Sequence, residues 1–148
     1  MINIRRATLS DLEKLAVLFD GYRIFYKQES DVIAAQNFLK ERMEKEESVI
    51  LVAEQDSVLL GFTQLFPLFS SVGMKRTWLL NDLFVATNAR KMGIGSLLLE
   101  AAKEFGSGTN SRWLLLQTAA DNYTAQSVYE SNGWKKLTDI FYEMPISS

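Results

Sequence analysis

The sequence predicts an α/β (α+β) fold with a mixed central sheet of six to seven strands and about four helices. Segments with strand-like and helix-like apolar spacing follow one another in the order β-α-α-β-β-β-α-β-α-β-β. The early strands form an antiparallel hairpin, whereas the later strand–helix–strand–helix order favours two neighbouring parallel strands with a right-handed crossover. A chain of 148 residues is long enough for one hydrophobic core, so residues 1–148 are expected to form a single domain.

The N-terminal part is predicted to be a strand followed by two helices. Residues 2–6 alternate in polarity and begin the sheet. Ser10 and Glu13 match a capping box, which starts the first helix at Ser10 and lets it run to about Tyr26. The second helix starts after Ser30 and ends in a charged stretch. Its expected buried positions are Ile33, Phe38 and Met43.

The remaining strands are short apolar segments bounded by turn residues. They are predicted at 49–53, 58–66, 78–85 and 113–117, with a final pair near 135–137 and 141–144. A loop is expected from Phe69 to Arg76. Two further helices are predicted, one with apolar spacing from Ile94 to about Phe105, and one that begins at Asn122 and is closed by Gly133.

The composition excludes several kinds of chemistry. The chain has no cysteine and no histidine, which removes disulfides, a cysteine nucleophile, a Ser–His–Asp triad and the usual zinc sites. No metal is therefore expected. A net charge of −2 gives no general attraction to nucleic acid or to an anionic membrane. Without an apolar run of about 18 residues or a signal-like N-terminus, the expected location is cytoplasmic.

A glycine-containing turn, Arg90-Lys91-Met92-Gly93-Ile94-Gly95, stands between a predicted strand and a predicted helix. The first turn of a helix has N–H groups without intrahelical partners, and the helix dipole adds positive charge there. Glycines let a phosphate approach the backbone closely. The residues after Gly95 fit neither a P-loop nor a dinucleotide fingerprint. A pyrophosphate site is therefore expected, and the alternative is an ordinary surface turn.

A second candidate site lies on the helix that begins at Asn122. Asn122 and Tyr129 are seven residues apart, which is roughly 10 Å along one helix face. The small Ala125 lies between them. That face suits an extended ligand arm, with an amide at one end and a phenol at the other. The structural alternative is that Asn122 caps the helix and Tyr129 is a half-buried aromatic.

Taken together, these segments resemble the GNAT superfamily of N-acetyltransferases. The resemblance rests on Arg90–Gly95 followed by three leucines, on Asn122–Trp134, and on an element order that covers essentially the whole chain. The stretch Leu80–Val85 also resembles the central strand of the polyamine and small-amine branch. The resemblance implies a GNAT fold in which a bulge near Asn81-Asp82 splays the parallel fourth and fifth strands. It also implies acetyl-CoA as co-substrate.

The resemblance further implies which residues bind and react. Amides from Lys91 to Ser96 would hold the pyrophosphate, the strand backbone would pair with pantetheine, and Tyr129 would stand near the sulfur. The expected residues for acetyl-CoA are Leu83, Phe84, Val85, Arg90, Lys91, Met92, Gly93, Ile94, Gly95, Ser96, Asn122, Ala125 and Tyr129. The expected catalytic residues are Tyr129 and Asp82.

One position departs from the similar polyamine enzymes. They carry a glutamate, proposed as general base, directly before the aspartate of this strand, whereas here the residue is Asn81. An amide cannot serve as that base, which also puts the polyamine substrate in doubt. Direct attack by a bound amine on the thioester is expected. Ordered water or a carboxylate such as Asp82 would take the amine proton, and the Tyr129 phenol would stabilise the leaving thiolate.

The acceptor is expected to be a small-molecule primary amine, bound across the sheet from acetyl-CoA. Aromatic faces and carboxylates hold ammonium groups, and the candidate contacts are Tyr26, Glu29, Asn81 and Asp82. A protein or peptide amine stays open as an alternative, as do a non-catalytic acyl-CoA-binding regulatory domain and a domain without a ligand. A homodimer is expected from exposed late strands. Neither nucleic acid nor a membrane is an expected partner.

Overall fold

The computed structural model describes residues 1–147, which divide into two compact units, Met1–Gln117 and the residues from Thr118 onward. The first unit contains the whole sheet and three α-helices, and the second contains one α-helix. The expectation of a single domain over 1–148 therefore stays a prediction. None of the helices in residues 1–147 has both the length and the apolar character needed to cross a bilayer.

Five strands form one mixed sheet in the order β1-β2-β3-β4-β5. Pairs from β1 to β4 are antiparallel, and β4 pairs with β5 in parallel, as the order of elements predicted. The α/β class is thus confirmed, with fewer strands than expected. The strands are β1 (Asn3–Arg6), β2 (Val49–Gln55), β3 (Val58–Ser70), β4 (Lys75–Val85) and β5 (Leu114–Leu116).

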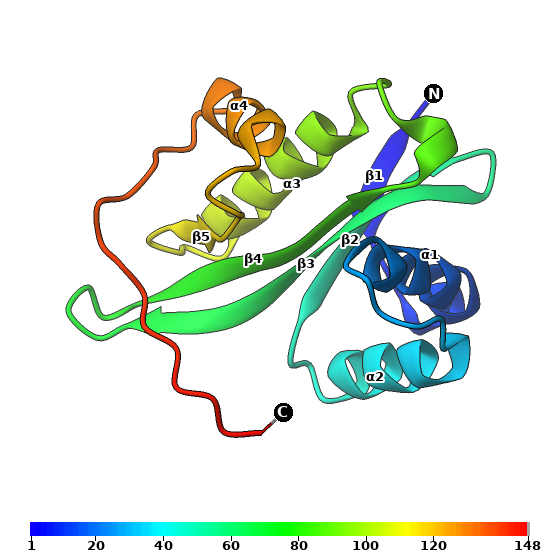
Figure 1. The fold of residues 1–148 in the computed structure, drawn as a ribbon, viewed down its shortest axis with the longest axis horizontal. Helices are drawn as coiled ribbons and strands as arrows, with labels where there is room; N and C mark the ends of the chain where they lie inside the picture. Colours follow the sequence, from blue (N-terminus) through cyan, green and yellow to red (C-terminus); the bar gives the residue numbers. More distant parts are fainter. Residues whose placement is uncertain (148) are drawn as a thin grey trace. The chain divides into compact units, whose positions relative to one another are not determined.

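The helices of the first unit cover both faces of this sheet (Figure 1). On one side, α1 (Leu12–Phe25) and α2 (Val32–Glu44) enclose a core with fully buried Leu15 and Leu39. On the other side, α3 (Ile94–Gly108) buries an apolar stripe against the sheet. Burial of such faces is the main stabilising contribution to the unit.

The first helix begins later than the sequence predicted. The capping box is formed by Thr8 and Asp11, not by Ser10 and Glu13, and it opens a 3-10 turn, η1 (Leu9–Asp11), before α1. The Asp11 carboxylate accepts the Thr8 N–H at 2.8 Å and is held by two guanidinium hydrogen bonds from Arg5. The ion pair with β1 therefore selects which polar residue caps the helix.

The buried face of α2 also differs from the prediction. Ile33 is 76% exposed and Phe38 is 40% exposed, whereas Ala35 and Leu39 are buried. Phe38 nevertheless stacks on Phe19 of α1, with the ring centroids 5.9 Å apart. The small Ala35 allows α2 to lie close to its neighbour, which turns the larger side chains to the rim.

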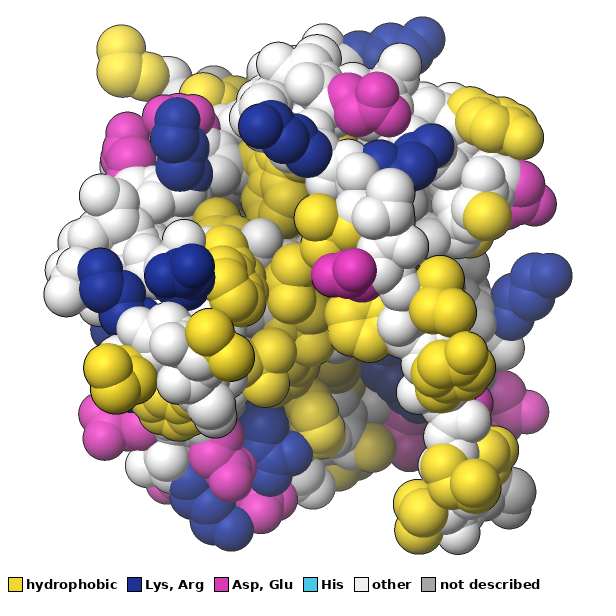
Figure 2. Space-filling model, turned by 90° about the vertical axis from the view of Figure 1, so that its left-hand side faces the viewer, with side chains coloured by type: hydrophobic (Ala, Val, Ile, Leu, Met, Phe, Trp, Pro, Cys, Tyr) yellow, Lys and Arg dark blue, Asp and Glu magenta, His cyan; other side chains and the backbone are white. Residues whose placement is uncertain are grey.

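The expected loop from Phe69 to Arg76 is mostly strand. The β3–β4 pairing continues to Ser70 and Lys75, which leaves a turn of only four residues, 71–74. Arg76 lies over the Phe69 ring at 4.9 Å and extends the hairpin by a cation–π contact. Figure 2 shows hydrophobic side chains between lysines and arginines on the face of the molecule toward which this hairpin points.

The two final strands predicted near 135–137 and 141–144 are absent, because residues 134–147 form neither helix nor strand. Several of their apolar side chains are largely exposed, among them Phe141, Tyr142 and Met144. A strand needs a partner, and the alternation of side chains alone does not supply one. The prediction of six to seven strands is therefore wrong by these two segments.

Candidate active site

A β-bulge on β4 separates two parts of the strand. Leu80 pairs with Leu65 of β3, and Asp82 pairs with Gln64, so Asn81 is an extra residue without an opposite partner. This is the bulge predicted near Asn81-Asp82. The parallel pairing with β5 covers only Trp78–Leu80 on β4, and the two strands separate where the bulge begins. The expected splayed parallel strands are thus present.

The bulge also changes which face of the sheet the side chains of β4 reach. Trp78 contacts Phe105 of α3, with ring centroids 5.1 Å apart. Phe84 instead contacts Tyr22 of α1 at 6.0 Å, on the opposite face. Residues an even number apart would share one face in a regular strand. The extra residue at Asn81 reverses this, so that Asp82 and Phe84 turn toward α1.

Asp82 is a buried carboxylate, 4% exposed, in a setting of neutral hydrogen-bond donors. Gln64 Nε2 donates to Asp82 Oδ2, and Asn81 Nδ2 donates to Oδ1 at 2.9 Å. Burial raises the pKa of the Asp82 carboxyl above its ordinary value, while hydrogen bonds from Gln64, Tyr22 and Asn81 act in the lowering direction. A carboxylate of this kind is suited to accept a proton.

Beyond the bulge, the outer edge of β4 has no strand partner within residues 1–147. Ala86 N–H donates to Leu60 O of the β3 side at 2.8 Å. Backbone groups alternate along a strand, so the N–H and C=O of Leu83 and Val85 point to the other, open edge. An extended amide-containing chain can therefore pair there, which is the geometry expected for pantetheine.

The end of β4 and the start of α3 lie side by side. After β4 the chain forms a short 3-10 turn, η2 (Thr87–Ala89). A Cβ on Gly61 of β3 would lie 2.8 Å from the Phe84 carbonyl oxygen and 3.2 Å from Cγ2 of Ile94. Only glycine at position 61 permits this approach, which brings the first turn of α3 next to the open strand edge.

The turn itself has the backbone shape of an anion site. Lys91 and Gly93 both have left-handed φ values, 71° and 75°. Gly93 is the N-cap of α3 and has no side chain to accept the first helical N–H groups, and Leu97 N–H is the donor to Gly93 O. Those N–H groups and the helix dipole therefore favour a negative ligand at the helix start.

Nothing in the fold of the chain itself requires glycine at position 95. Its φ is not in the left-handed region, and a Cβ built on it would meet nothing within 4 Å. Because glycine has no side chain, the space beside the backbone of this first helical turn stays open. A phosphate can therefore approach the backbone closely there. The other expected residues of the turn, Met92 and Ser96, are exposed and half-buried respectively.

Arg90 lies against the strand end. Its Nε donates to Val85 O at 3.2 Å, and its guanidinium lies 5.7 Å from the centroid of the Phe25 ring and 5.8 Å from that of Phe84. It thus covers one carbonyl of the open edge.

The second unit presents the predicted Asn122–Tyr129 pair on α4 (Tyr123–Ser131). Asn122 Oδ1 accepts the Ala125 N–H at 3.1 Å, so it is a helix cap, as the structural alternative proposed. Tyr129 is half-buried with its ring centroid 6.3 Å from that of Trp134. Gly133, with φ 90°, closes the helix as predicted.

The expected acceptor residues are brought together in part. Tyr26 packs on Tyr22 with ring centroids 5.1 Å apart, and the Tyr22 hydroxyl donates to Asn81 O at 3.4 Å. This links Tyr26 with Asn81 and Asp82 through Tyr22, which lies in the same segment of mixed aromatic and acidic residues but was not among the expected contacts. Glu29 lies in the exposed loop after α1. No cluster of acidic side chains suited to a metal occurs in residues 1–147.

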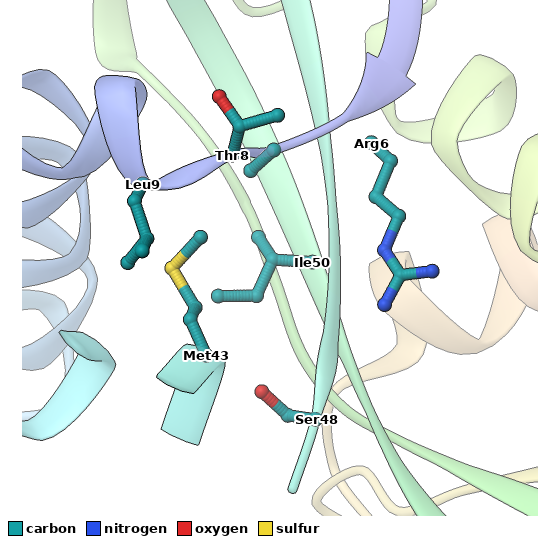
Figure 3. Close-up of a pocket in the computed structure, with 7 residues that line it drawn as sticks. Arg6, Thr8, Leu9, Met43, Ser48 and Ile50 are labelled. Atoms are coloured by element: carbon teal, nitrogen blue, oxygen red, sulfur yellow. The ribbon is translucent and has the colours of Figure 1, made fainter. Parts of the chain in front are cut away.

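A small pocket of about 130 Å³ lies elsewhere on the α1 face, between the end of β1 and the end of α2 (Figure 3). This volume is well below that of an ordinary ligand pocket, about 300–1,000 Å³, and is too small for acetyl-CoA. In Figure 3, Leu9, Met43 and Ile50 point toward one another, and Arg6 lies across the strand from them. Ser48, at the rim, is the residue that connects this region with the bulge, because its hydroxyl donates to Gln64 Oε1 at 2.8 Å.

Comparison with known proteins agrees with this arrangement. The model of the acetyltransferase (GNAT) family matches residues 12–134. YhfO, an uncharacterized N-acetyltransferase of Bacillus subtilis (strain 168), is 50% identical over 137 residues, which cover 93% of this chain and 92% of that protein. A probable acetyltransferase of Haemophilus influenzae is 35% identical over 126 residues, 84% of each chain.

A crystal structure of a probable acetyltransferase has the same fold, with a TM-score of 0.95, 42% identity and coverage of 99% of both chains. The likeness extends through the bulged strand, the start of α3 and α4, which together span residues 75–131. The chain therefore belongs to the GNAT family of acetyltransferases and is an enzyme of the N-acetyltransferase type.

Proposed function

We propose that the enzyme transfers the acetyl group of acetyl-CoA to the primary amine of a small molecule, by direct attack in a ternary complex. The observation that carries this proposal is the open edge of β4 at Leu83 and Val85, which ends beside the glycine-containing start of α3. Strand pairing and helix-start N–H groups are the two features that an extended amide arm with a pyrophosphate would use.

In this proposal, the amine approaches from the α1 face of the sheet. Tyr22 lies there against the Asp82 carboxylate, and its ring packs against the rings of Tyr26 and Phe84. Aromatic faces and one buried carboxylate favour a cationic ammonium group over an anionic acceptor. A small primary amine is therefore favoured, and nothing at this site selects polyamines among such amines.

The reaction needs two protons removed from the ammonium nitrogen and one leaving group stabilised. An alkyl ammonium has a pKa near 10, so Asp82 or an ordered water accepts the first proton before the nitrogen attacks the thioester carbon. The C–N bond forms, the C–S bond breaks and CoA leaves as a thiolate, while the nitrogen releases its second proton to water. The resemblance assigns the Tyr129 phenol to that thiolate as hydrogen-bond or proton donor.

The test combines binding with turnover. Calorimetry measures acetyl-CoA binding, and free-thiol release is followed with a panel of amines, polyamines, aminoglycosides, amino acids and peptides. Tyr129→Phe is expected to lower kcat about tenfold, which is less than the roughly 100-fold or more of full proton transfer because the phenol need only donate a hydrogen bond to the thiolate, with little change in the Kd for acetyl-CoA. Tyr123→Phe, an exposed tyrosine on the same helix, is the control.

Unchanged turnover in Tyr129→Phe would remove the phenol from the mechanism, and no association with acetyl-CoA at millimolar concentration would end the proposal as a whole. Release of thiol with peptides alone would favour a protein N-acetyltransferase. The proposal also includes a single domain over residues 1–148, a homodimer and a cytoplasmic location, which remain predictions.

A further inference from the structure

A line of buried polar side chains crosses three neighbouring strand positions on the α1 face. Ser48, directly before β2, donates to Oε1 of Gln64 on β3 at 2.8 Å, and Gln64 Nε2 donates to Asp82 on β4. Gln64 is fully buried and Ser48 is 6% exposed. The mechanism proposed above uses Asp82 but gives no role to the two residues behind it.

The position of Gln64 is unusual for its surroundings. On the same face of β3, two residues away, Phe62 is fully buried and contacts Phe19 and Tyr22. An apolar side chain would suit this core, because a buried amide is costly unless both its oxygen and its nitrogen are hydrogen-bonded. Both are hydrogen-bonded here, the oxygen to Ser48 and the nitrogen to Asp82. The amide therefore serves these hydrogen bonds and not the packing of the core.

The orientation of the Gln64 amide decides which of its atoms faces Asp82. The Ser48 hydroxyl donates to the amide oxygen, which leaves the NH₂ group facing Asp82. An ionised carboxylate accepts hydrogen bonds only, whereas the opposite amide orientation would place two oxygens against each other. The Asp82 carboxylate makes no ion pair within the described part of the chain, so these neutral donors alone support its charge.

We infer that Gln64, oriented by Ser48, is a positioning residue that holds Asp82 ionised and aimed at the bulge, ready to take the proton of the acceptor amine. This inference rests on the proposed function. Tyr22 of α1 is the titratable group in contact with Asp82, and the facing groups of β3, of β4 and of the residue before β2 are the neutral Gln64, Asn81 and Ser48. A neutral donor supports the charge while still allowing protonation, which a guanidinium in its place would oppose.

The experiment measures the titration of the Asp82 carboxyl directly, by carbon-13 NMR of the full chain labelled in aspartate, with Asp82→Asn to assign the signal. Gln64→Leu removes a hydrogen bond to a charged group, so the pKa of Asp82 is expected to rise by about one unit. The acid limb of kcat/KM should move upward by the same amount. Ser48→Ala is expected to cause a smaller rise, because the amide loses its orientation.

Thr63→Val is the matched control. Thr63 is equally buried on the same strand, but its hydroxyl donates at 2.7 Å to the backbone oxygen of Asp82 and not to the carboxylate. The titration of Asp82 should therefore stay unchanged in this variant. Thermal unfolding confirms that each variant is folded, and Ser48→Ala serves the test if Gln64→Leu does not fold.

An Asp82 titration that is the same in folded wild type, Gln64→Leu and Ser48→Ala would overturn the inference. It would leave the acetyl-transfer proposal standing, since that proposal is tested by acetyl-CoA binding and thiol release. Conversely, if Asp82→Asn keeps full turnover, the role of Asp82 as proton acceptor fails, and the inference fails with it.

Discussion

The start of α3 and the bulge of β4 lie at the two ends of the same stretch of chain, and they are built in opposite ways. The start of α3 is exposed, and its features belong to the backbone: left-handed φ at Lys91 and Gly93, and empty space at Gly95. The bulge is buried, and its features belong to side chains that bond one another, from Ser48 through Gln64 to Asp82.

This contrast separates binding from chemistry. Backbone N–H groups at an open helix start can hold an anion without any particular side chain. A carboxylate that exchanges a proton needs a defined environment, which only buried neighbours supply. Changes at the first region should therefore alter affinity for acetyl-CoA, and changes at the second should alter turnover.

The largest expected effect is at the bulge. Asp82→Asn removes the proposed proton acceptor while keeping the size of the side chain, so kcat is expected to fall about 100-fold. The Kd for acetyl-CoA should change by less than about threefold, equivalent to roughly 0.7 kcal/mol. Stopped-flow thiol detection and calorimetry give the two values. A large loss of affinity would break the separation between the two regions.

A smaller effect is expected at the start of α3. Gly95→Ala places a methyl group in space that only a ligand would use, so the Kd for acetyl-CoA should rise about tenfold, or about 1.4 kcal/mol. Thermal stability should stay the same or increase slightly, because alanine favours helix. Gly108→Ala, near the other end of α3, also meets nothing within 4 Å and is the control.

If Gly95→Ala and Gly108→Ala bind acetyl-CoA equally well, the helix start does not touch the phosphates.

Gly93→Ala tests the backbone conformation of the same turn. Its φ of 75° is unfavourable for a residue with a Cβ, so the free energy of unfolding should fall by about 1 kcal/mol.

The smallest effect tests whether any buried carboxylate behaves like Asp82. Asp11 lies against Arg5, and hydrogen bonds from that guanidinium are the main reason why the Asp11 pKa is lowered from 3.8 to about 2. A lowered pKa stabilises the fold above pH 3.8, and this contribution is lost as the pH falls through about 2.

Asp11→Asn should therefore cost about 1 kcal/mol of unfolding free energy at pH 7, since solvent screens the partly exposed Arg5. The difference from wild type should shrink below pH 4 and vanish near pH 2, while kcat stays unchanged. Urea unfolding across this pH range provides the check. A loss of turnover in a well-folded Asp11→Asn variant would show that the ion-paired Asp11 also contributes to catalysis. That result would contradict the contrast with Asp82.

The same contrast explains what the sequence could predict. Helix-start glycines are a local signal and the order of elements favours a parallel pair, so the Gly93–Gly95 turn and that pair were predictable from the residues, whereas the bulge near Asn81 was implied by the family resemblance. Gln64 was not, because its partners are 16 residues before it and 18 after it. Its one local signal is a glutamine, after a threonine, in the middle of an otherwise apolar strand.

The errors in the fold have a similar origin. The choice of Asp11 over Ser10 as capping partner depends on Arg5, and the length of the β3–β4 hairpin depends on Arg76 against Phe69. The final strands failed because β-propensity does not specify a partner strand.

The extra residue at Asn81 means that length, more than side-chain identity, sets the shape of this strand. Deletion of that single codon would make the Leu80–Leu65 and Asp82–Gln64 pairs neighbours on a regular ladder, with Asp82 still toward α1, and would remove the bulge at which β4 and β5 separate. Insertions and deletions within residues 78–85 are therefore expected to be far less tolerated than substitutions in any library screened for activity. A compensating insertion nearby should rescue such a deletion, and no point mutation should.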